Sequence, residues 1–255
     1  MNLKEFFVEN PKIALAFSGG VDSAYLLYAA LENGVDVKCY FVKSQFQPEF
    51  ELEDARQLVS ELAQRFKRDE DSLLRIVHVD TLEDPAIASN PENRCYYCKQ
   101  RIFGMILCAA AEDGYSVILD GTNASDEEGD RPGMRALREL QVKSPLRLCG
   151  LTKADVRKKS KEAGLFTWDK PSYACLATRI PTGQAITAED LQRVELAETI
   201  LEAMGFSDFR VRLFHGAAKL QLKPEQMLVA MECRSEIVKK LKPLFAEVLL
   251  DMEGR

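Results

Sequence analysis

The chain has 255 residues, of which 46% are hydrophobic and 29% charged, and its formal net charge at pH 7 is −6. This fits a globular protein with one large domain, or with a full domain and a smaller companion. The acidic balance argues against a general nucleic-acid-binding surface. No apolar run approaches the roughly 18 residues that a membrane-spanning helix needs, and the N-terminal segment lacks the apolar core of a signal peptide. We therefore expect a cytoplasmic protein with no membrane or nucleic-acid partner.

The cysteine and histidine counts limit the chemistry further. Seven cysteines, an odd number, in a chain without a secretion signal argue against a disulfide framework. Only two histidines, His78 and His215, are present, which argues against a histidine-rich metal site. Each cysteine must therefore be judged by its own surroundings.

Strand and helix patterns alternate through the first half of the chain. The first strand is a continuous apolar run, typical of a parallel strand covered on both faces, and Gly34 is placed to end the helix that follows. The expected strands are 12–18, 35–44, 73–80 and 115–123, and the expected helices are 21–33, 50–66 and 99–111. This alternation predicts the α/β class, with right-handed crossovers and a doubly wound parallel sheet.

The second half of the chain lacks this regular alternation of strand and helix patterns. After Gly121 the sequence is rich in loops, and Arg131, Arg135 and Arg138 are expected on one helical face. A capping box of Thr152 and Asp155 then begins a short helix. Residues 166–184 show little periodicity and are interpreted as a long functional loop. The C-terminal elements are a helix from 187 to 205, two strands around a His-Gly turn in 209–222, a helix over 223–241 and a last strand over 245–251.

These patterns predict three parts. Residues 1–170 form the nucleotide-binding domain, 171–184 a catalytic loop and linker, and 185–255 a smaller α+β domain that contributes to substrate binding. We found no internal repeat and no low-complexity tract that would indicate a different architecture.

The stretch Ser18-Gly19-Gly20-Val21-Asp22-Ser23 stands at the first strand-to-helix turn. Loop N–H groups and a helix N-terminus at such a turn favour an anion. The Walker A and dinucleotide patterns are both absent. The remaining pattern, S-G-G-x-D-S, resembles the pyrophosphate loop of the PP-loop ATP pyrophosphatase superfamily. The alternative is a glycine turn that only lets the helix pack on the strand.

This resemblance implies roles for the loop residues in binding ATP. Gly19 and Gly20 let the backbone approach the phosphates, and Ser18 and Ser23 offer hydroxyls. Asp22 would repel phosphate, and a magnesium ion would reconcile the two. Two further ATP-binding residues are expected at the end of the fourth strand, where ligands of open α/β sheets bind: they are Gly121 and Asn123.

Three further stretches narrow the resemblance. They are NPENRCYYCK at 90–99, WDKPSYACLATRIP at 168–181 and FRVRLFHGAAKLQL at 209–222. Together with the glycine loop they resemble the LarE family of ATP-dependent sacrificial sulfur transferases, which act in assembly of the nickel-pincer nucleotide cofactor. The resemblance covers nearly the whole chain, and the stretch at 168–181 carries most of its weight.

The resemblance implies an unusual reaction. A carboxylate of a pyridinium biscarboxylate mononucleotide attacks the α phosphate of ATP, and pyrophosphate leaves. Cys175 then attacks the activated carbonyl and AMP leaves. Elimination leaves the sulfur on the product as a thiocarboxylate and dehydroalanine in the protein. Lys170 and Arg179 flank Cys175 and are expected to favour its thiolate, whereas Cys39, Cys108 and Cys233 are interpreted as small buried hydrophobic residues.

Other residues are assigned to the substrate. Arg210 and Arg212 alternate on one strand, so both face the same side, and we expect them to bind the substrate phosphate. The alternative is two surface arginines paired with acids such as Asp208. Arg179 is also expected to contact the substrate, and Tyr96 and Tyr97 are expected to line the nucleotide or the substrate ring.

The pair Cys95 and Cys98 fits more than one interpretation. A zinc site needs two further ligands, and no second cysteine pair exists. The pair also fits a redox dithiol, and it fits a packed loop with solvated charges. Some family members are thought to hold an iron–sulfur cluster through cysteines grouped around the residue that corresponds to Cys175. No second cysteine follows Cys175 in its loop, so no cluster is expected.

We expect ATP and magnesium as cofactors, a small-molecule nucleotide as substrate, and a homo-oligomer. The family often has an acid linked to metal binding where this chain has Gln221, which puts a metal role for that strand in doubt. The rival enzymes are an amidating PP-loop synthetase and a tRNA thiolase, although neither a glutaminase domain nor an appended RNA-binding domain is evident. The non-enzymatic rival is a nucleotide-binding module without turnover.

Overall fold

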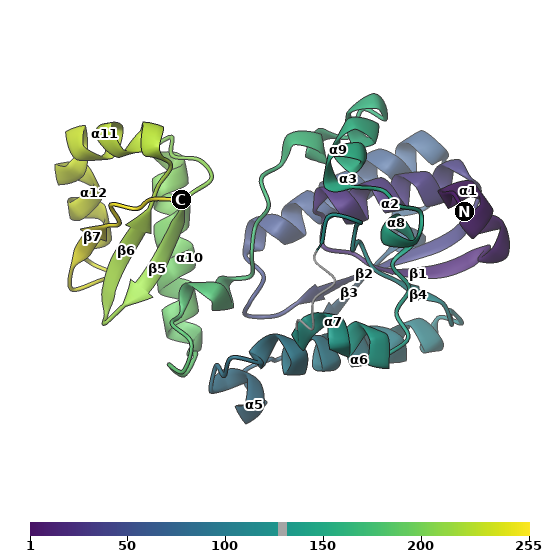
Figure 1. The fold of residues 1–255 in the computed structure, drawn as a ribbon, viewed down its shortest axis with the longest axis horizontal. Coiled ribbons are helices and arrows are strands. Elements are labelled where there is room, and N and C mark those ends of the chain that lie inside the picture. Colours follow the sequence, from purple (N-terminus) through teal and green to yellow (C-terminus); the bar gives the residue numbers. More distant parts are fainter. Residues whose placement is uncertain (127–131) are drawn as a thin grey trace. The chain divides into compact units, whose positions relative to one another are not determined.

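The computed structural model describes residues 1–126 and 132–255, and they divide into two compact units. Unit 1 consists of residues 1–80 and 93–172, and unit 2 of residues 81–92 and 173–255. Figure 1 labels most of the helices and strands of both. Segment 81–92 thus belongs to unit 2, although no sequence signal separated it from the first domain. The domain limits expected from the sequence stay a prediction.

Unit 1 is an α/β unit. Its strands are β1 (Lys12–Ala16), β2 (Asp36–Lys43), β3 (Leu74–His78) and β4 (Ile118–Leu119). Its helices are α1 (Leu3–Glu9), α2 (Val21–Glu32), α3 (Glu49–Phe66), α4 (Glu70–Leu73), α6 (Arg94–Glu112), α7 (Pro132–Glu139), α8 (Pro145–Leu148), α9 (Lys153–Glu162) and the 3-10 helix η1 (Phe166–Asp169). Arg135 and Arg138 lie on α7, and Arg131 lies outside the described residues.

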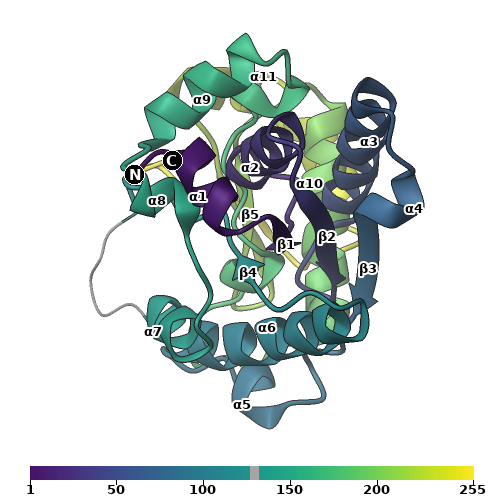
Figure 2. The same ribbon diagram turned by 90° about the vertical axis from the view of Figure 1, so that its right-hand side faces the viewer.

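The sheet of unit 1 has the order β3-β2-β1-β4, and every neighbouring pair is parallel. Side chains alternate between the two faces of a strand, so Ile13 and Leu15 of β1 enter one core and Ala14 enters the other. Helices α2, α3 and α9 cover the first face and α6 and α7 the second, as Figure 2 shows. The predicted doubly wound parallel sheet is confirmed.

The strand order creates a switch point next to β1. Its neighbour on one side is β2, and its neighbour on the other is β4, which comes about 100 residues later in the chain. Ligands of open α/β sheets bind where neighbouring strands are followed by connections that leave in opposite directions. The loops after β1 and β4 therefore form the expected ligand-binding edge, and they hold Ser18–Ser23 and Gly121–Asn123.

Unit 2 contains the strands β5 (Arg210–Phe214), β6 (Ala217–Gln221) and β7 (Val248–Leu250) in the order β5-β6-β7. Its helices are α5 (Pro85–Ala88), the 3-10 helix η2 (Leu176–Arg179), α10 (Ala188–Ala203), α11 (Pro224–Glu232) and α12 (Arg234–Leu241). The hairpin β5–β6 turns at His215 and Gly216, whose φ angles of 50° and 82° fit the expected tight turn. This is the predicted small α+β part.

Segment 81–92 is bound to residues 181–186 by hydrogen bonds within unit 2. The amide of Asn90 donates from Nδ2 to Pro181 O over 2.8 Å, and Ile186 N donates to Ala88 O over 2.7 Å. The buried amide of Asn90 therefore supplies a donor to a stretch that has no strand or long helix of its own.

Several predicted elements differ from the structure in detail. The fourth strand is only Ile118–Leu119, because the chain after it turns into the binding edge. The long loop at 166–184 contains the two 3-10 helices η1 and η2. The helix over 223–241 is two helices that meet at Cys233. The helix that contains Cys98 begins at Arg94, ahead of the expected start at residue 99.

None of the helices in the described ranges combines the length and the apolar character that a bilayer crossing requires.

Candidate functional site

The loop after β1 brings the backbone close to its surroundings. Gly19 has a φ of 70°, and a Cβ there would lie 3.2 Å from Cβ of Ala55, so the position favours glycine on two counts. Gly20 is the N-cap of α2 and provides no side-chain cap. The first-turn N–H groups of α2 are therefore not capped by that residue, and such a helix N-terminus favours an anion.

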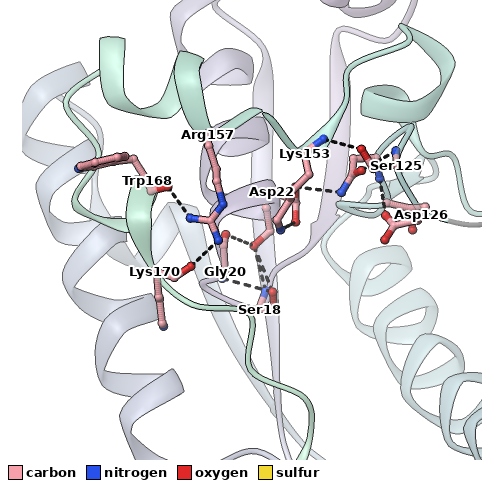
Figure 3. Close-up of polar contacts among 12 residues, drawn as sticks. Ser18, Gly20, Asp22, Ser125, Asp126, Lys153, Arg157, Trp168 and Lys170 are labelled. Atoms are coloured by element: carbon pink, nitrogen blue, oxygen red, sulfur yellow. Dashed lines mark hydrogen bonds and ion pairs between the residues drawn. The ribbon is translucent and has the colours of Figure 1, made fainter. Parts of the chain in front are cut away.

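Two serine hydroxyls fix the shape of this loop. Ser18 Oγ accepts from Gly20 N over 3.3 Å, and Ser23 Oγ donates to Gly20 O over 3.1 Å. The two hydroxyl oxygens lie 3.3 Å apart. Figure 3 shows Ser18 and Gly20 in this turn. The structure therefore brings Ser18, Gly20 and Ser23 together as the sequence predicts, in a preorganised turn.

The loop after β4 packs directly on the first turn of α2. A Cβ on Gly121 would lie 3.1 Å from Ser23 N and 3.2 Å from Cβ of Asp22, so only glycine fits without displacement. Asn123 is 3% exposed, and its Nδ2 donates to Oδ1 of Asp22 over 3.2 Å. The expected residues Gly121 and Asn123 thus meet the glycine loop. Gly121 serves close packing of the two loops.

Asp22 has a cationic partner that sequence reasoning missed. Nζ of Lys153 lies 2.5 Å from Oδ2 of Asp22, and the two residues appear side by side in Figure 3. Lys153 is the first residue of α9, which begins with the predicted capping box of Thr152 and Asp155. The available signal was a lysine in the first turn of a capped helix, where acidic residues are favoured.

A second layer of contacts supports the loop after β4. The buried carboxylate of Asp120 accepts from Ser144 Oγ over 2.6 Å and from the hydroxyl of Thr122. Arg147 donates from Nη2 to Asp126 O over 2.5 Å. Ser125 Oγ accepts from Lys153 N over 2.9 Å, which joins this loop to the start of α9. Both partners of Asp22 are therefore held by their own neighbours.

Arg157 of α9 holds the last part of unit 1. It donates from Nη1 to Trp168 O over 2.7 Å and from Nη2 to Lys170 O over 2.8 Å, as Figure 3 shows. Lys170 also forms an ion pair with Asp54 within unit 1. Its charge is therefore balanced there, whereas the sequence suggested that Lys170 and Arg179 together activate Cys175.

The tyrosines assigned to the substrate lie on α6. Tyr96 donates its hydroxyl to Oε2 of Glu139 over 2.6 Å, and its ring lies 4.2 Å from the guanidinium of Arg135. The rings of Tyr96 and Tyr97 meet edge to face at 5.5 Å. The contacts of Tyr96 join α6 to α7, and the two tyrosine rings also contact one another. The substrate role of both tyrosines stays a prediction.

The cysteines divide by exposure. Cys39 is buried as predicted, and burial raises the pKa of its thiol far above the usual range. Cys108 is exposed and Cys233 is half-buried, so their interpretation as buried residues is wrong. Cys108 lies on a solvent-exposed part of α6, and Cys233 stands at the junction of α11 and α12. Cys95 is exposed and Cys98 is half-buried, and both lie in the first turns of α6.

Cys175 lies in unit 2 at the N-cap of η2 and is half-buried. Arg179 follows it on η2 and is 1% exposed. It donates from Nη1 to Ala174 O over 3.1 Å and pairs with the carboxylate of Glu198 on α10. A glutamate that is 7% exposed is rare in a surface helix, and sequence reasoning did not single it out.

Arg210 and Arg212 lie on β5 with Tyr173 and Arg179 nearby. Arg212 donates from Nε to Gln221 Oε1 and from Nη1 to Thr178 O, both over 2.5 Å. The guanidiniums of Arg210 and Arg179 lie 4.9 and 4.6 Å from the Tyr173 ring. Burial, and then repulsion from Arg179 and Arg255, lowers the pKa of Arg210 to about 10. Arg179 and Arg210 are buried and Arg212 is half-buried, and a set of cations with this repulsion attracts an anion.

The sequence was compared with known proteins. Residues 7–189 match the family described as thiamine biosynthesis protein (ThiI). The chain belongs to the ThiI family of PP-loop proteins. The glycine loop, the switch point of the sheet and its neighbouring loop all lie within the matched residues, so the family assignment and the geometry agree.

The chain is also similar to the following three proteins. An uncharacterized protein of Synechocystis is 35% identical over 99% of this chain and 93% of its own length. The pyridinium-3,5-bisthiocarboxylic acid mononucleotide synthase of Lactiplantibacillus plantarum is 29% identical over 95% of this chain and 86% of its own length. The tRNA-specific 2-thiouridylase MnmA of Fervidobacterium nodosum is 28% identical over 43% of this chain and 36% of its own length.

These similarities confirm the resemblance to the LarE type that the sequence motifs indicated. Membership of the PP-loop family indicates a nucleotide-binding, ATP-using enzyme. The structure groups Ser18, Gly19, Gly20, Asp22, Ser23, Gly121 and Asn123 at one edge of unit 1, and it groups Arg179, Arg210 and Arg212 in unit 2, where Cys175 lies.

Proposed function

We propose that this protein is an ATP-dependent sacrificial sulfur transferase of the nickel-pincer cofactor type. It adenylylates a carboxylate of a pyridinium biscarboxylate mononucleotide and then transfers the sulfur of Cys175 to it. The observation that carries the proposal is the presence of Cys175 and the PP-loop in one chain that resembles a bisthiocarboxylic acid mononucleotide synthase over 95% of its length.

The first step takes place at the edge of unit 1. The substrate carboxylate attacks the α phosphorus of ATP, an acyl adenylate forms and pyrophosphate leaves. Gly19 and the uncapped start of α2 support a role in binding the leaving phosphates, because backbone N–H groups there are preorganised donors. We assign Lys153 to the same phosphates, with Asp22 orienting its ammonium.

Magnesium fits this site as a companion of the nucleotide. In the described ranges, no three His, Cys, Asp or Glu side chains are grouped to hold a metal. Magnesium usually keeps several waters and binds through one or two carboxylates together with substrate phosphates. The carboxylate of Asp22 would serve that purpose through the lone pairs that Asn123 and Lys153 do not use, and the ion would supply neutralisation of phosphate charge.

The second step uses unit 2. The Cys175 thiolate attacks the carbonyl carbon of the acyl adenylate, and AMP leaves with the electron pair of the broken C–O bond. A base then removes the α proton of Cys175, the Cβ–S bond breaks, and the sulfur leaves as the thiocarboxylate. The half-buried position of Cys175 supports this role, since a nucleophile must be reached by substrate.

Arg210 and Arg212 are the proposed ligands of the substrate phosphate. Both are part of a set of cations in unit 2. Burial first, and then repulsion from Arg179 and Arg255, lowers the pKa of Arg210, and a phosphate would relieve the repulsion. A phosphate accepts a guanidinium in a bidentate manner, which also orients the substrate. We do not assign Arg179 to the substrate phosphate, because its guanidinium already pairs with Glu198. Its proposed role is to support the loop that contains Cys175.

The test is one incubation of the protein with pyridinium-3,5-biscarboxylic acid mononucleotide, ATP and magnesium. We expect AMP, pyrophosphate, a thiocarboxylate product and a chain lighter by one hydrogen sulfide molecule at Cys175. If pyrophosphate is released while the mass of the chain stays unchanged and no thiocarboxylate forms, the proposed sulfur transfer is ruled out. That result would favour an amidating synthetase. Turnover with tRNA, but not with the mononucleotide, would favour a thiolase of the MnmA kind.

A further inference from the structure

Glu198 contacts both ends of the short segment that carries Cys175. It lies in the middle of α10, and its carboxylate is buried. Oε1 accepts from Arg179 Nε over 2.7 Å and from Val211 N over 2.9 Å. Oε2 accepts from Arg179 Nη2 over 3.2 Å and from the hydroxyl of Tyr173. One carboxylate therefore takes four donors from both sides of Cys175 and from β5.

Arg179, which Glu198 holds in place, also forms hydrogen bonds with the segment around Cys175. Its Nη1 donates to Ala174 O over 3.1 Å and to Thr178 Oγ1 over 2.8 Å. The Thr178 hydroxyl in turn donates to Cys175 O over 2.8 Å. The carbonyl groups of Ala174 and Cys175 are thus both fixed through side chains whose geometry depends on Glu198.

The charges at this point persist at neutral pH. Burial by itself lowers the pKa of Arg179, but its hydrogen bonds and charge attraction with Glu198 outweigh burial, and the net shift is upward. Burial, and then the charge of Glu198, raises the pKa of the Tyr173 hydroxyl far above its usual range. Tyr173 therefore remains a donor and Arg179 a cation.

Stability alone gives a weak reason for such a pair. A buried ion pair contributes little net stability relative to well-packed apolar residues. The segment between Tyr173 and Arg179 contains only the single turn η2, and 3-10 turns have poor hydrogen-bond geometry of their own. A fixed carboxylate on a long helix supplies what that segment lacks, since a nucleophile requires a supporting shell that sets its place.

We infer that Glu198 is a positioning residue for Cys175, and that it holds the segment Tyr173–Arg179 at both ends so that the sulfur meets the activated carbonyl. The inference rests on the proposed sulfur transfer. Glu198 does not touch the reacting atoms in this assignment. It acts through Arg179 and Tyr173.

The test compares Glu198→Gln, Tyr173→Phe and the control Glu202→Gln. Glu202 is exposed and lies one turn further along α10. Each protein is mixed with pyridinium-3,5-biscarboxylic acid mononucleotide, ATP and magnesium, and single-turnover rates are measured for pyrophosphate release and for loss of hydrogen sulfide mass from the chain. Melting temperatures show which variants are folded, and Tyr173→Phe removes only one hydroxyl if Glu198→Gln fails to fold.

We expect Glu198→Gln to slow sulfur transfer about 10- to 100-fold at saturating mononucleotide, the range that small misplacements of reacting groups cause. Tyr173→Phe should slow it less, and the control should match the wild type. Pyrophosphate release at saturating mononucleotide should stay within about twofold, because the glycine loop lies in unit 1 and has no contact that depends on Glu198 in this assignment. A merely structural loss would lower both steps together.

A second measurement needs no substrate. Hydrogen exchange of the amides in 173–179 should be faster in Glu198→Gln than in the wild type and in the control. If the wild type transfers sulfur and both Glu198→Gln and Tyr173→Phe transfer it at the same rate as the wild type, the inference is overturned. Absence of sulfur transfer in the wild type would instead refute the proposed function and the catalytic purpose of Glu198. Faster exchange in the variant would then show only that the segment is held.

Discussion

Nζ of Lys153 lies 2.5 Å from Oδ2 of Asp22, although 131 residues separate them in the chain. The pair joins the first turn of α9 to the first turn of α2, next to the glycine loop. An aspartate beside a phosphate site is costly by itself, because like charges repel. With Lys153 attached, it becomes part of a neutral pair, and in the proposed function the ammonium of this pair contacts phosphate oxygens from a fixed position.

Lys153→Met should slow pyrophosphate release about 10²- to 10³-fold, the loss expected when one preorganised donor to a developing charge is removed. Asp22→Asn should have a comparable effect with the fold intact. The measurement is single-turnover release of pyrophosphate. Lys158→Met is the matched control, since Lys158 is exposed on the same helix. ADP and orthophosphate as first products in the wild type would exclude the PP-loop reaction.

Gly121→Ala should weaken ATP binding and lower the melting temperature. The added Cβ would lie 3.1 Å from Ser23 N, and such overpacking typically costs about 1–3 kcal/mol. Nucleotide titration and thermal unfolding measure the two effects. Gly104→Ala is the control: it lies on α6, its Cβ meets no atom within 4 Å, and alanine in a helix should stabilise by roughly 0.5–1 kcal/mol. Equal behaviour of the two variants would refute the packing argument.

Arg212→Ala and Arg210→Ala should each raise the mononucleotide concentration for half-maximal rate. A charge-assisted contact contributes roughly 1.5–3 kcal/mol, and ATP affinity should hardly change. Titrations with each ligand make the comparison, with the exposed Arg234 of α12 changed to Ala as control. If ATP binding weakens and mononucleotide binding does not, the two units have been assigned the wrong ligands.

Cys175→Ala should separate the two proposed steps. It should still release pyrophosphate for one turnover, but it should form no thiocarboxylate and keep its mass. Cys108→Ala should behave as the wild type, since Cys108 is an exposed cysteine on a helix of unit 1. Product analysis and intact-protein mass spectrometry decide the outcome. Repeated sulfur transfer by wild-type protein of unchanged mass would contradict a sacrificial cysteine.

The pKa of Asp113 leads to a prediction of how the stability of unit 1 changes in acid. Burial by itself raises the pKa of Asp113, but hydrogen bonds from Lys38, Tyr40 and Arg75 outweigh it, and the net pKa lies below the usual value. Such a carboxylate stabilises the fold above the unfolded pKa of about 3.9, and that stability is lost as pH falls through the lower folded pKa. Asp113→Asn should therefore lower the melting temperature at pH 7 and flatten its decline in acid. Asp71→Asn, at an exposed position, should leave both unchanged.

Local patterns in the sequence predicted much of the fold. The apolar run of β1, the glycine loop and the capping box at Thr152 each depend on neighbouring residues, and each is found where the sequence places it. The order of the strands was not predicted, because no local signal states which strand becomes the neighbour of β1. The short length of β4 was also not foreseen, since its apolar residues continue into a turn.

The site was predicted where its residues belong to a motif. Lys153 was missed because its partner Asp22 is distant in sequence. Glu198 was missed because a glutamate in an amphipathic helix is normally solvated, and its burial becomes visible only when Arg179 is placed against it. The homo-oligomer and the cytoplasmic location remain predictions.

The spacing of the contacts to Asp22 also has a consequence for how the protein is made. Its partners Asn123 and Lys153 follow it by 101 and 131 residues, and chains are synthesised from the N-terminus at about 5–20 residues per second. The glycine loop therefore leaves the ribosome many seconds before the residues that complete its surroundings. Nascent chains that stop short of Lys153 should not retain ATP, so nucleotide retention would report when unit 1 has been finished.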